Sequence, residues 1–162
     1  MPSWQRLLDH GSRACLRLSV LENKRSLTIL RELIATFRRF GLPQRIRVDN
    51  EACFNSILIK AGLSLLGIHL QTIDRHCPWQ NGRIERFFGT LKRHLDDIIP
   101  ASHINLEIMM REFRGWYNHA RPHQHLGGFT PAEVWEGRAK STNAPQWISI
   151  WDGRINGWWF PP

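Results

Sequence analysis

The sequence is poor in cysteine and lacks a long apolar run. Its three cysteines, Cys15, Cys53 and Cys77, are scattered and form no CxxC pair, which excludes a disulfide framework and argues against a zinc site. The longest apolar run, residues 57–70, contains a lysine and a histidine and is too short to cross a bilayer. The first residues lack the apolar segment of a signal peptide. We therefore expect a cytoplasmic protein with reduced thiols.

Acidic residues are also in short supply relative to basic ones. The chain has 22 Lys and Arg against 14 Asp and Glu, which gives a net charge of +8 and a pI near 10.4. Such a charge serves solubility, but it favours more strongly a polyanionic partner, and we expect nucleic acid. A membrane surface is disfavoured because no long amphipathic basic helix is evident. The 162 residues, 42% of them hydrophobic, suit one domain with a short appendage.

The hydrophobic pattern predicts alternating strands and helices. In chain order we expect a hairpin (3–9 and 13–21), a helix (26–40), a strand (45–49), a helix (56–66), a strand (68–73), a long helix (83–98), a helix (105–119) and a short helix after Thr130. The two single strands should pair through a crossover, which defines an α/β fold. We divide the chain into a core, residues 1–136, and a Trp-rich tail, residues 137–162, that could form a small hairpin.

The sequence allows more detailed predictions for two of these helices. The helix over 26–40 should begin with a Ser26 cap and end at Gly41. Its predicted apolar face consists of Leu27, Leu30, Leu33, Ile34 and Phe37. The helix over 83–98 should bury a stripe of Ile84, Phe87, Phe88, Leu91 and Leu95 and present a second, basic stripe of Arg83, Arg86, Thr90 and Arg93.

Asp49 and Glu85 are the candidate catalytic and metal-binding residues. Asp49 ends a predicted strand, and Glu85 lies in the first turn of the long helix. Carboxylates in these two positions could hold the Mg²⁺ or Mn²⁺ ions of a two-metal site acting on a phosphodiester. Each also has an ordinary structural explanation, because Asp49 suits a turn and a first-turn Glu85 is favoured by the helix dipole.

Basic residues flank Glu85 along the same predicted helix. Gly89, one turn on, leaves the helix face bare, and Lys92, two turns on, could reach a phosphate. An ordinary solvated basic face is the alternative explanation. We assign DNA binding to five residues of this region: Asn81, Arg83, Arg86, Lys92 and Arg93.

Three motifs together resemble the retroviral-integrase-like DDE transposases of bacterial insertion sequences. Residues 48–54 (VDNEACF) resemble the second-Asp motif of that family, and residues 78–92 (PWQNGRIERFFGTLK) resemble its third-acid motif. Residues 116–119 (WYNH), 121–123 (RPH) and 126–133 (LGGFTPAE) resemble its downstream signature. The resemblance covers roughly residues 5–136.

The resemblance implies an RNase H-like mixed sheet flanked by helices, a catalytic Asp-Asp-Glu triad binding two Mg²⁺ or Mn²⁺ ions, and strand transfer into DNA. Asp49 matches the second acid and Glu85 the third. The first Asp of the family lies on the first, central strand, and the chain begins at the following hairpin, so we expect that strand and acid to be missing. Asp9 is not expected to substitute, because it falls in the hairpin turn.

Two classes of function follow from this incomplete triad. The first is the core of an insertion-sequence transposase that is inactive alone and works with itself as a homo-oligomer or with a full-length transposase. The second is a non-catalytic fragment, regulatory or decayed, that binds DNA or a transposase.

Overall fold

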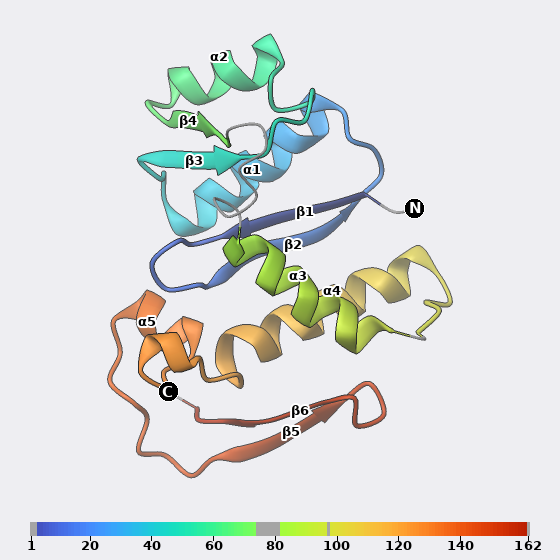
Figure 1. The fold of residues 1–162 in the computed structure, drawn as a ribbon, viewed down its shortest axis with the longest axis vertical. Helices are drawn as coiled ribbons and strands as arrows, with labels where there is room; N and C mark the ends of the chain where they lie inside the picture. Colours follow the sequence, from blue (N-terminus) through green and yellow to red (C-terminus); the bar gives the residue numbers. More distant parts are fainter. Residues whose placement is uncertain (1–2, 74–81, 97, 162) are drawn as a thin grey trace. The chain divides into compact units, whose positions relative to one another are not determined.

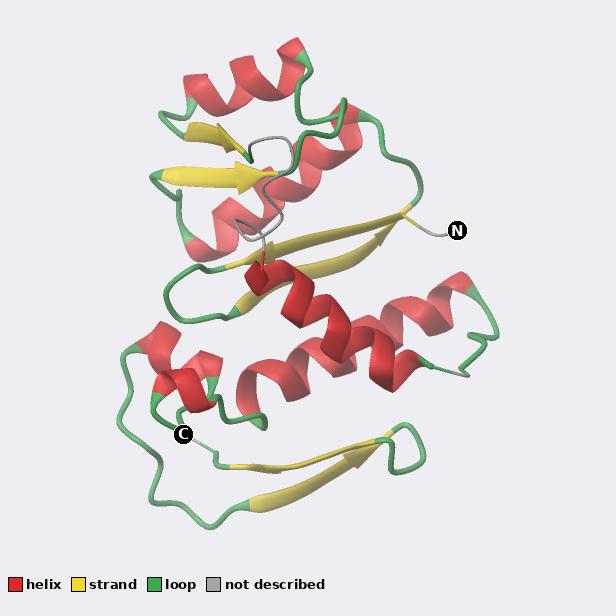
Figure 2. Cartoon of the chain, in the orientation of Figure 1, coloured by secondary structure: helices red, strands yellow, loops and turns green. Residues whose placement is uncertain are grey.

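The computed structural model describes residues 3–73, 82–96 and 98–161 (Figure 1). Within them the strands form three two-stranded sheets, β1–β2, β3–β4 and β5–β6 (Figure 2). Over the described residues, no ladder joins the β1–β2 sheet to the β3–β4 sheet.

The chain divides into two compact units, and the first comprises residues 1–5 and 21–85. Its regular elements are helix α1 (Ser26–Phe40), strand β3 (Arg45–Val48), helix α2 (Ile57–Leu65) and strand β4 (His69–Thr72). Strands β3 and β4 run parallel, in a register from Arg45↔His69 to Val48↔Thr72. Parallel strands need a crossover, which α2 supplies. The predicted strand–helix–strand arrangement is therefore confirmed.

Helix α1 has the predicted bounds, but two details of its prediction are wrong. Its buried residues are Ile29, Leu33, Thr36 and Phe37, whereas Leu27 is 48% exposed. Ser26 does not cap the helix, because its hydroxyl donates to the carbonyl oxygen of Cys53, 3.1 Å away. Gly41 ends the helix as predicted, with φ at +89° and its N–H bonded to the Phe37 carbonyl.

Helix α2 packs closely on α1 at Gly62. A Cβ atom at Gly62 would lie 3.1 Å from both terminal carbons of Leu30. Ser56 caps α2 by accepting the Ile59 N–H, and Ile59 and Leu63 are buried. With Ile46 and Val48 of β3, they form an apolar core. This core holds the end of β3, and thus Asp49, in place.

The second unit comprises residues 6–20 and 86–162. Its elements include most of the hairpin of β1 (Ser3–Leu8) and β2 (Cys15–Leu21), most of helix α3 (Gly82–Leu95) and helix α4 (His103–His119). A short 3-10 helix η2 (Gln124–Leu126), helix α5 (Pro131–Glu136) and the β5–β6 hairpin (Gln146–Ile150 and Ile155–Trp159) follow. The sequence Thr-Pro-Ala-Glu over residues 130–133 predicts a capping box, and Thr130 and Glu133 form it at the start of α5.

Aromatic packing between α3 and α4 forms the core of the second unit. The Phe87 ring lies edge-on to Tyr117 and Phe113, at centroid distances of 4.8 and 5.7 Å. The helical pattern of this segment predicts five buried residues, and all five are buried together with Trp116: Leu106, Met109, Met110, Phe113 and Tyr117. The β5–β6 hairpin covers α4, where the Trp116 indole donates to the Asn156 carbonyl at 3.0 Å. The Trp-rich tail is therefore an ordered hairpin.

Candidate metal and nucleic-acid site

Asp49 is positioned by the end of β3. It is half-buried, directly follows Val48, and its Oδ1 atom is buried. The Ile73 N–H donates to the Val48 carbonyl at 3.0 Å, so the parallel pairing continues up to Asp49. The carboxyl ends of parallel strands are a common place for ligand-binding residues, because the strands fix the backbone and the chain then turns away.

The residues after Asp49 form a tight turn held by its own hydrogen bonds. The N–H groups of Phe54 and Asn55 donate to the Glu51 carbonyl, at 3.1 and 3.3 Å. The Glu51 carboxylate pairs with Lys24 at 3.2 Å. Because Glu51 is engaged in this pair, Asp49 is the residue of this turn best suited to bind a metal ion.

Glu85 lies in the first turn of α3 and is exposed. One turn on, a Cβ atom at Gly89 would meet nothing within 4 Å, so the helix face beside Glu85 is bare, as predicted. Arg93 folds back over this gap and donates to the Gly89 carbonyl at 3.2 Å. A ligand approaching Glu85 along this face would therefore find open space at Gly89.

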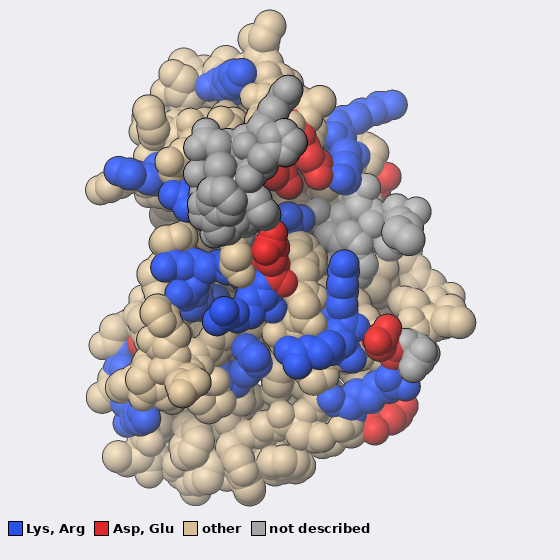
Figure 3. Space-filling view, in the orientation of Figure 1, with Lys and Arg blue, Asp and Glu red and all other residues tan. Residues whose placement is uncertain are grey.

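The predicted DNA-binding residues on α3 are all exposed: Arg83, Arg86, Lys92 and Arg93. Lys and Arg side chains gather over this helix on the face shown in Figure 3. Asn81, the fifth, lies outside the described residues. The basic stripe differs from prediction at Thr90, which is 2% exposed and donates its hydroxyl to the Arg86 carbonyl at 3.1 Å. Thr90 therefore belongs to the buried side of the helix.

Asp9 acts as a turn residue. Its Oδ2 atom accepts hydrogen bonds from the N–H and the hydroxyl of Ser12, both at 2.7 Å. Its own N–H donates to the Ala14 carbonyl at 2.8 Å. These bonds close the β1–β2 turn, so the Asp9 carboxylate already has a structural role.

Asp49 and Glu85 fall in the same compact unit, at a strand end and a helix start. Their carboxylates are the hard oxygen ligands that Mg²⁺ and Mn²⁺ prefer. Among the described residues, no group of three or more His, Cys, Asp or Glu side chains could hold a metal ion. The described site thus supplies two acids, and their sharing of a metal ion stays a prediction.

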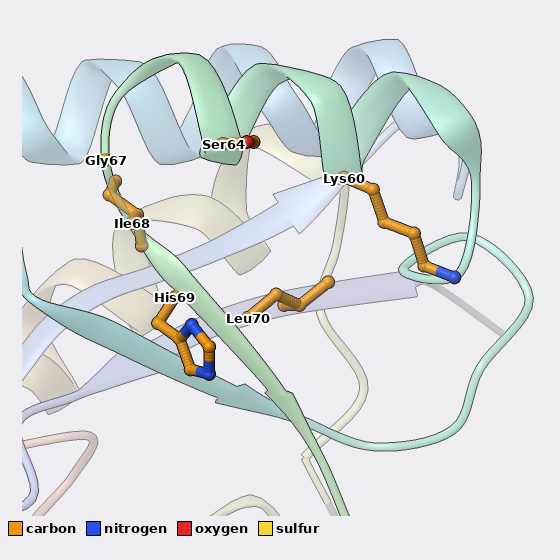
Figure 4. A pocket seen from close by; sticks show the side chains of 6 residues that line it. All are labelled: Lys60, Ser64, Gly67, Ile68, His69 and Leu70. Carbon is orange, nitrogen blue, oxygen red and sulfur yellow. The ribbon is translucent and has the colours of Figure 1, made fainter.

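A pocket of about 350 Å³ lies elsewhere in the first unit (Figure 4). It is lined by the end of α2 and the start of β4: Lys60, Ser64, Gly67, Ile68, His69 and Leu70. His69 pairs with Arg45 at the start of the β3–β4 ladder, whereas Asp49 follows the last pair, Val48↔Thr72. The pocket is therefore at the opposite end of the ladder from Asp49.

Arg121 and His123 stand out in the structure, although the sequence offered them only as part of a family signature. An Arg121 Nη1 atom lies 3.2 Å from His123 Nε2, and the guanidinium lies 5.5 Å from the Tyr117 ring centre. Burial and the charges of Arg121 and Arg13 lower the pKa of His123 to about 4. The half-burial of this pair has no sequence signal, because it depends on Tyr117 and Trp116 of α4, on which the guanidinium packs.

Known proteins resemble this chain in sequence and in fold. Residues 66–131 match the Integrase core domain family. An uncharacterised 39.2 kDa protein of insertion element IS476 from Xanthomonas euvesicatoria is 32% identical over 100 residues, covering 61% of this chain and 28% of that protein. The chain spans less than a third of the length of the curated relatives it matches.

Two solved structures share the fold. The catalytic core domain of BIV integrase superimposes with a TM-score of 0.66 at 20% identity, covering 84% of this chain and 91% of that one. The HTLV-2 integrase catalytic core domain in complex with magnesium superimposes with a TM-score of 0.62 at 17% identity, covering 82% and 92%. The resemblance to integrase-like cores is therefore confirmed, and the chain has an RNase H-like α/β fold. No helix over the described residues is long and apolar enough to span a membrane.

Proposed function

We propose that this chain is the core of an insertion-sequence transposase, a metal-dependent enzyme that transfers DNA strands. The main observation in support of this proposal is the placement of Asp49 at the end of β3 and Glu85 at the start of α3, in a chain with an integrase core fold. The insertion-element relative and the basic face of α3 support the same proposal.

In this proposal Asp49 and Glu85 hold the divalent metal, Mg²⁺ or Mn²⁺. Bound metal would supply activation of the attacking oxygen and stabilisation of the leaving oxygen during phosphodiester transfer. Asp49 is held by the β3–β4 ladder, and Glu85 projects from a helix whose adjacent face is bare at Gly89. Four side chains on α3, together with Asn81, position the DNA backbone: Arg83, Arg86, Lys92 and Arg93.

Over the described residues we assign two of the three acids that the proposed chemistry uses, Asp49 and Glu85. We expect strand transfer to need a third carboxylate beside them, so the chain by itself should have little activity. The expected partners are double-stranded DNA and either further copies of the chain or a full-length transposase. The incomplete set of acids also supports one alternative function, that of a non-catalytic fragment that binds DNA or a transposase.

Metal binding can be tested separately from catalysis. Mn²⁺ added to the ¹⁵N-labelled chain should broaden the amide NMR signals next to Asp49 and Glu85 at low concentration. Asp49→Asn and Glu85→Gln should each abolish the selective broadening, whereas Glu107→Gln, at an exposed residue of α4, should not. Unchanged broadening in both site variants would reject the metal site.

Catalysis is tested by incubating the chain with element-end DNA and Mg²⁺. We expect salt-dependent DNA binding with little end joining, because the triad is incomplete. Efficient joining by the chain alone, abolished by Glu85→Gln, would refute the requirement for a third acid. Metal-free DNA binding that Asp49→Asn and Glu85→Gln leave unchanged, with no selective Mn²⁺ broadening, would favour the non-catalytic alternative.

A further inference from the structure

Four arginines of the second unit concentrate positive charge around Tyr117 and His123. We call them the arginine cluster: Arg13 of the β1–β2 turn, Arg86 and Arg93 of α3, and Arg121 after α4. Over the described residues, no carboxylate lies within 4.0 Å of any of their guanidinium groups. Arginines that gather without acidic partners repel one another, so a bound anion would stabilise their arrangement.

Arg121 is the anchor of the cluster. Its half-buried guanidinium packs on aromatic rings, 5.5 Å from the Tyr117 centroid and 5.8 Å from that of Trp116. One of its nitrogens lies 3.2 Å from His123 Nε2. Since an arginine can only donate, this ring nitrogen accepts, and the histidine proton must lie on Nδ1. Arg121 is thus fixed in orientation by packing and one hydrogen bond, with further N–H donors remaining.

The other three arginines lie in segments that pack on the same part of α4. Arg86 precedes Phe87, whose ring centre lies 4.8 Å from that of Tyr117, and Arg93 precedes His94, whose ring centre lies 5.1 Å from that of Trp116. Arg13 lies two residues before Cys15, whose backbone is hydrogen-bonded to Asn118.

Burial raises the pKa of Tyr117 to about 12, and the charges of Arg121, Arg13 and Arg86 oppose this rise. Burial lowers the pKa of Arg121, and the charge of Arg93 lowers it further. Positive charge from three parts of the second unit therefore acts on Tyr117, Arg121 and His123.

We propose that the arginine cluster, together with His123, is a phosphate-binding site that holds a backbone phosphate of duplex DNA. The planar fork of a guanidinium binds phosphate through paired hydrogen bonds. A nucleic-acid phosphate is favoured over other anions because Arg86 and Arg93 lie on α3, the helix that carries Glu85 in its first turn. This choice of ligand rests on the proposed function. The site adds Arg13, Arg121 and His123 to the DNA-binding residues expected from sequence.

Binding of a fluorescent duplex to the full chain, measured at several salt concentrations, tests the proposal. Arg13→Asn is the first variant, because Arg13 has φ at +66° and asparagine tolerates that left-handed backbone. Arg121→Gln is the second, and Arg121→Lys retains the charge without the planar fork. Arg111→Gln, which removes an exposed arginine from α4, is the matched control.

We expect Arg13→Asn and Arg121→Gln each to weaken binding about tenfold. Each should also reduce the slope of log affinity against log salt by about 0.9. Arg121→Lys should recover part of the affinity, and Arg111→Gln should change it less than twofold. Equal losses in the control and in the cluster variants would overturn the proposal, because binding would then follow net charge rather than this site.

A second readout uses inorganic phosphate and the NMR signals of the His123 ring. Phosphate should shift these signals in the unmodified chain and in Arg111→Gln, but not in Arg121→Gln. A phosphate response without any loss of DNA affinity in the cluster variants would reject duplex DNA and point to a different phosphorylated partner. Neither readout depends on metal or on strand transfer, so failure of the proposed catalytic function would not produce the same result.

Discussion

The side-chain amide of Asn118 pairs with the backbone of Cys15, 103 residues away in the sequence. Its Oδ1 accepts the Cys15 N–H at 2.8 Å, and its Nδ2 donates to the Cys15 carbonyl at 2.9 Å. One side chain on α4 thus satisfies both backbone groups of the first residue of β2. The neighbouring Trp116 binds the β5–β6 hairpin in a similar way, through the Asn156 carbonyl. Trp116 and Asn118 of the WYNH motif therefore stabilise contacts within the second unit.

Asn118→Ala should destabilise the chain by about 1–3 kcal/mol, because both backbone groups of Cys15 lose their partner. The Cys15 thiol is 1% exposed, and burial raises its pKa to about 12. Thiol labelling of Cys15, followed by peptide mass spectrometry, should therefore be slow in the unmodified chain and faster in the variant. Asn105→Ala, at an exposed residue of the same helix, should leave the labelling rate unchanged. Equal rates in both variants would contradict a stabilising role for the hydrogen bonds between Asn118 and Cys15.

Phe87→Ala should destabilise the chain by about 3–5 kcal/mol, because it removes a ring from the core of the second unit. Phe87 is 1% exposed and contacts the rings of Phe113 and Tyr117 edge-on. Urea unfolding followed by tryptophan fluorescence would measure the change. Ile84→Ala, one turn earlier and only half-buried, should cost clearly less. An unchanged midpoint for Phe87→Ala would show that this stripe is not a core.

Gly157→Ala and Gly115→Ala should change stability in opposite directions. A Cβ at Gly157 would lie 2.6 Å from the Ala120 carbonyl oxygen and 3.0 Å from Trp116 Nε1, so β6 would have to move off α4. We expect a loss of about 1–3 kcal/mol from this overpacking. A Cβ at Gly115 on α4 meets nothing within 4 Å, and there alanine should gain about 0.5–1 kcal/mol. Thermal unfolding of the two variants would compare them directly.

Stability should fall as the pH is lowered from about 6.5 towards 4. The pKa of His123 is about 4 in the folded chain, below the ordinary histidine value of 6.5, because of burial and then the charges of Arg121 and Arg13. The unfolded chain therefore binds the proton first, and the stability present above pH 6.5 is lost between the two values. Because His123 is partly exposed and solvent screens its charge, we expect the free energy of unfolding to fall by only about 1–2 kcal/mol.

Denaturant unfolding at pH 7, 5.5 and 4.5 would measure this loss in the unmodified chain and in His123→Asn. The variant should lose part of the pH dependence. The remainder should reflect His94 and His119, whose pKa values are also lowered chiefly by burial. Identical pH profiles for the two chains would contradict the shifted pKa of His123.

Local patterns in the sequence predicted most of the elements, and tertiary contacts explain where they failed. The bounds of α1, the capping box at Thr130 and the buried face of α4 follow from signals within one or two helical turns. Leu27 and Thr90 were placed on the wrong faces, because helical periodicity leaves the direction of burial uncertain by about one residue. The Ser26 hydroxyl was assigned to a cap, but its partner, Cys53, lies 27 residues away.

The sequence by itself determined the alternation of strands and helices, the positions of the two acids and the basic face of α3, because these depend on residue type and spacing along the chain. Only the tertiary structure decided that Asn118 pairs with Cys15, that Glu51 pairs with Lys24, and that arginines from three elements converge on Tyr117 and His123. Such pairings depend on the distances between side chains that are remote in sequence, and the packing of the core sets those distances.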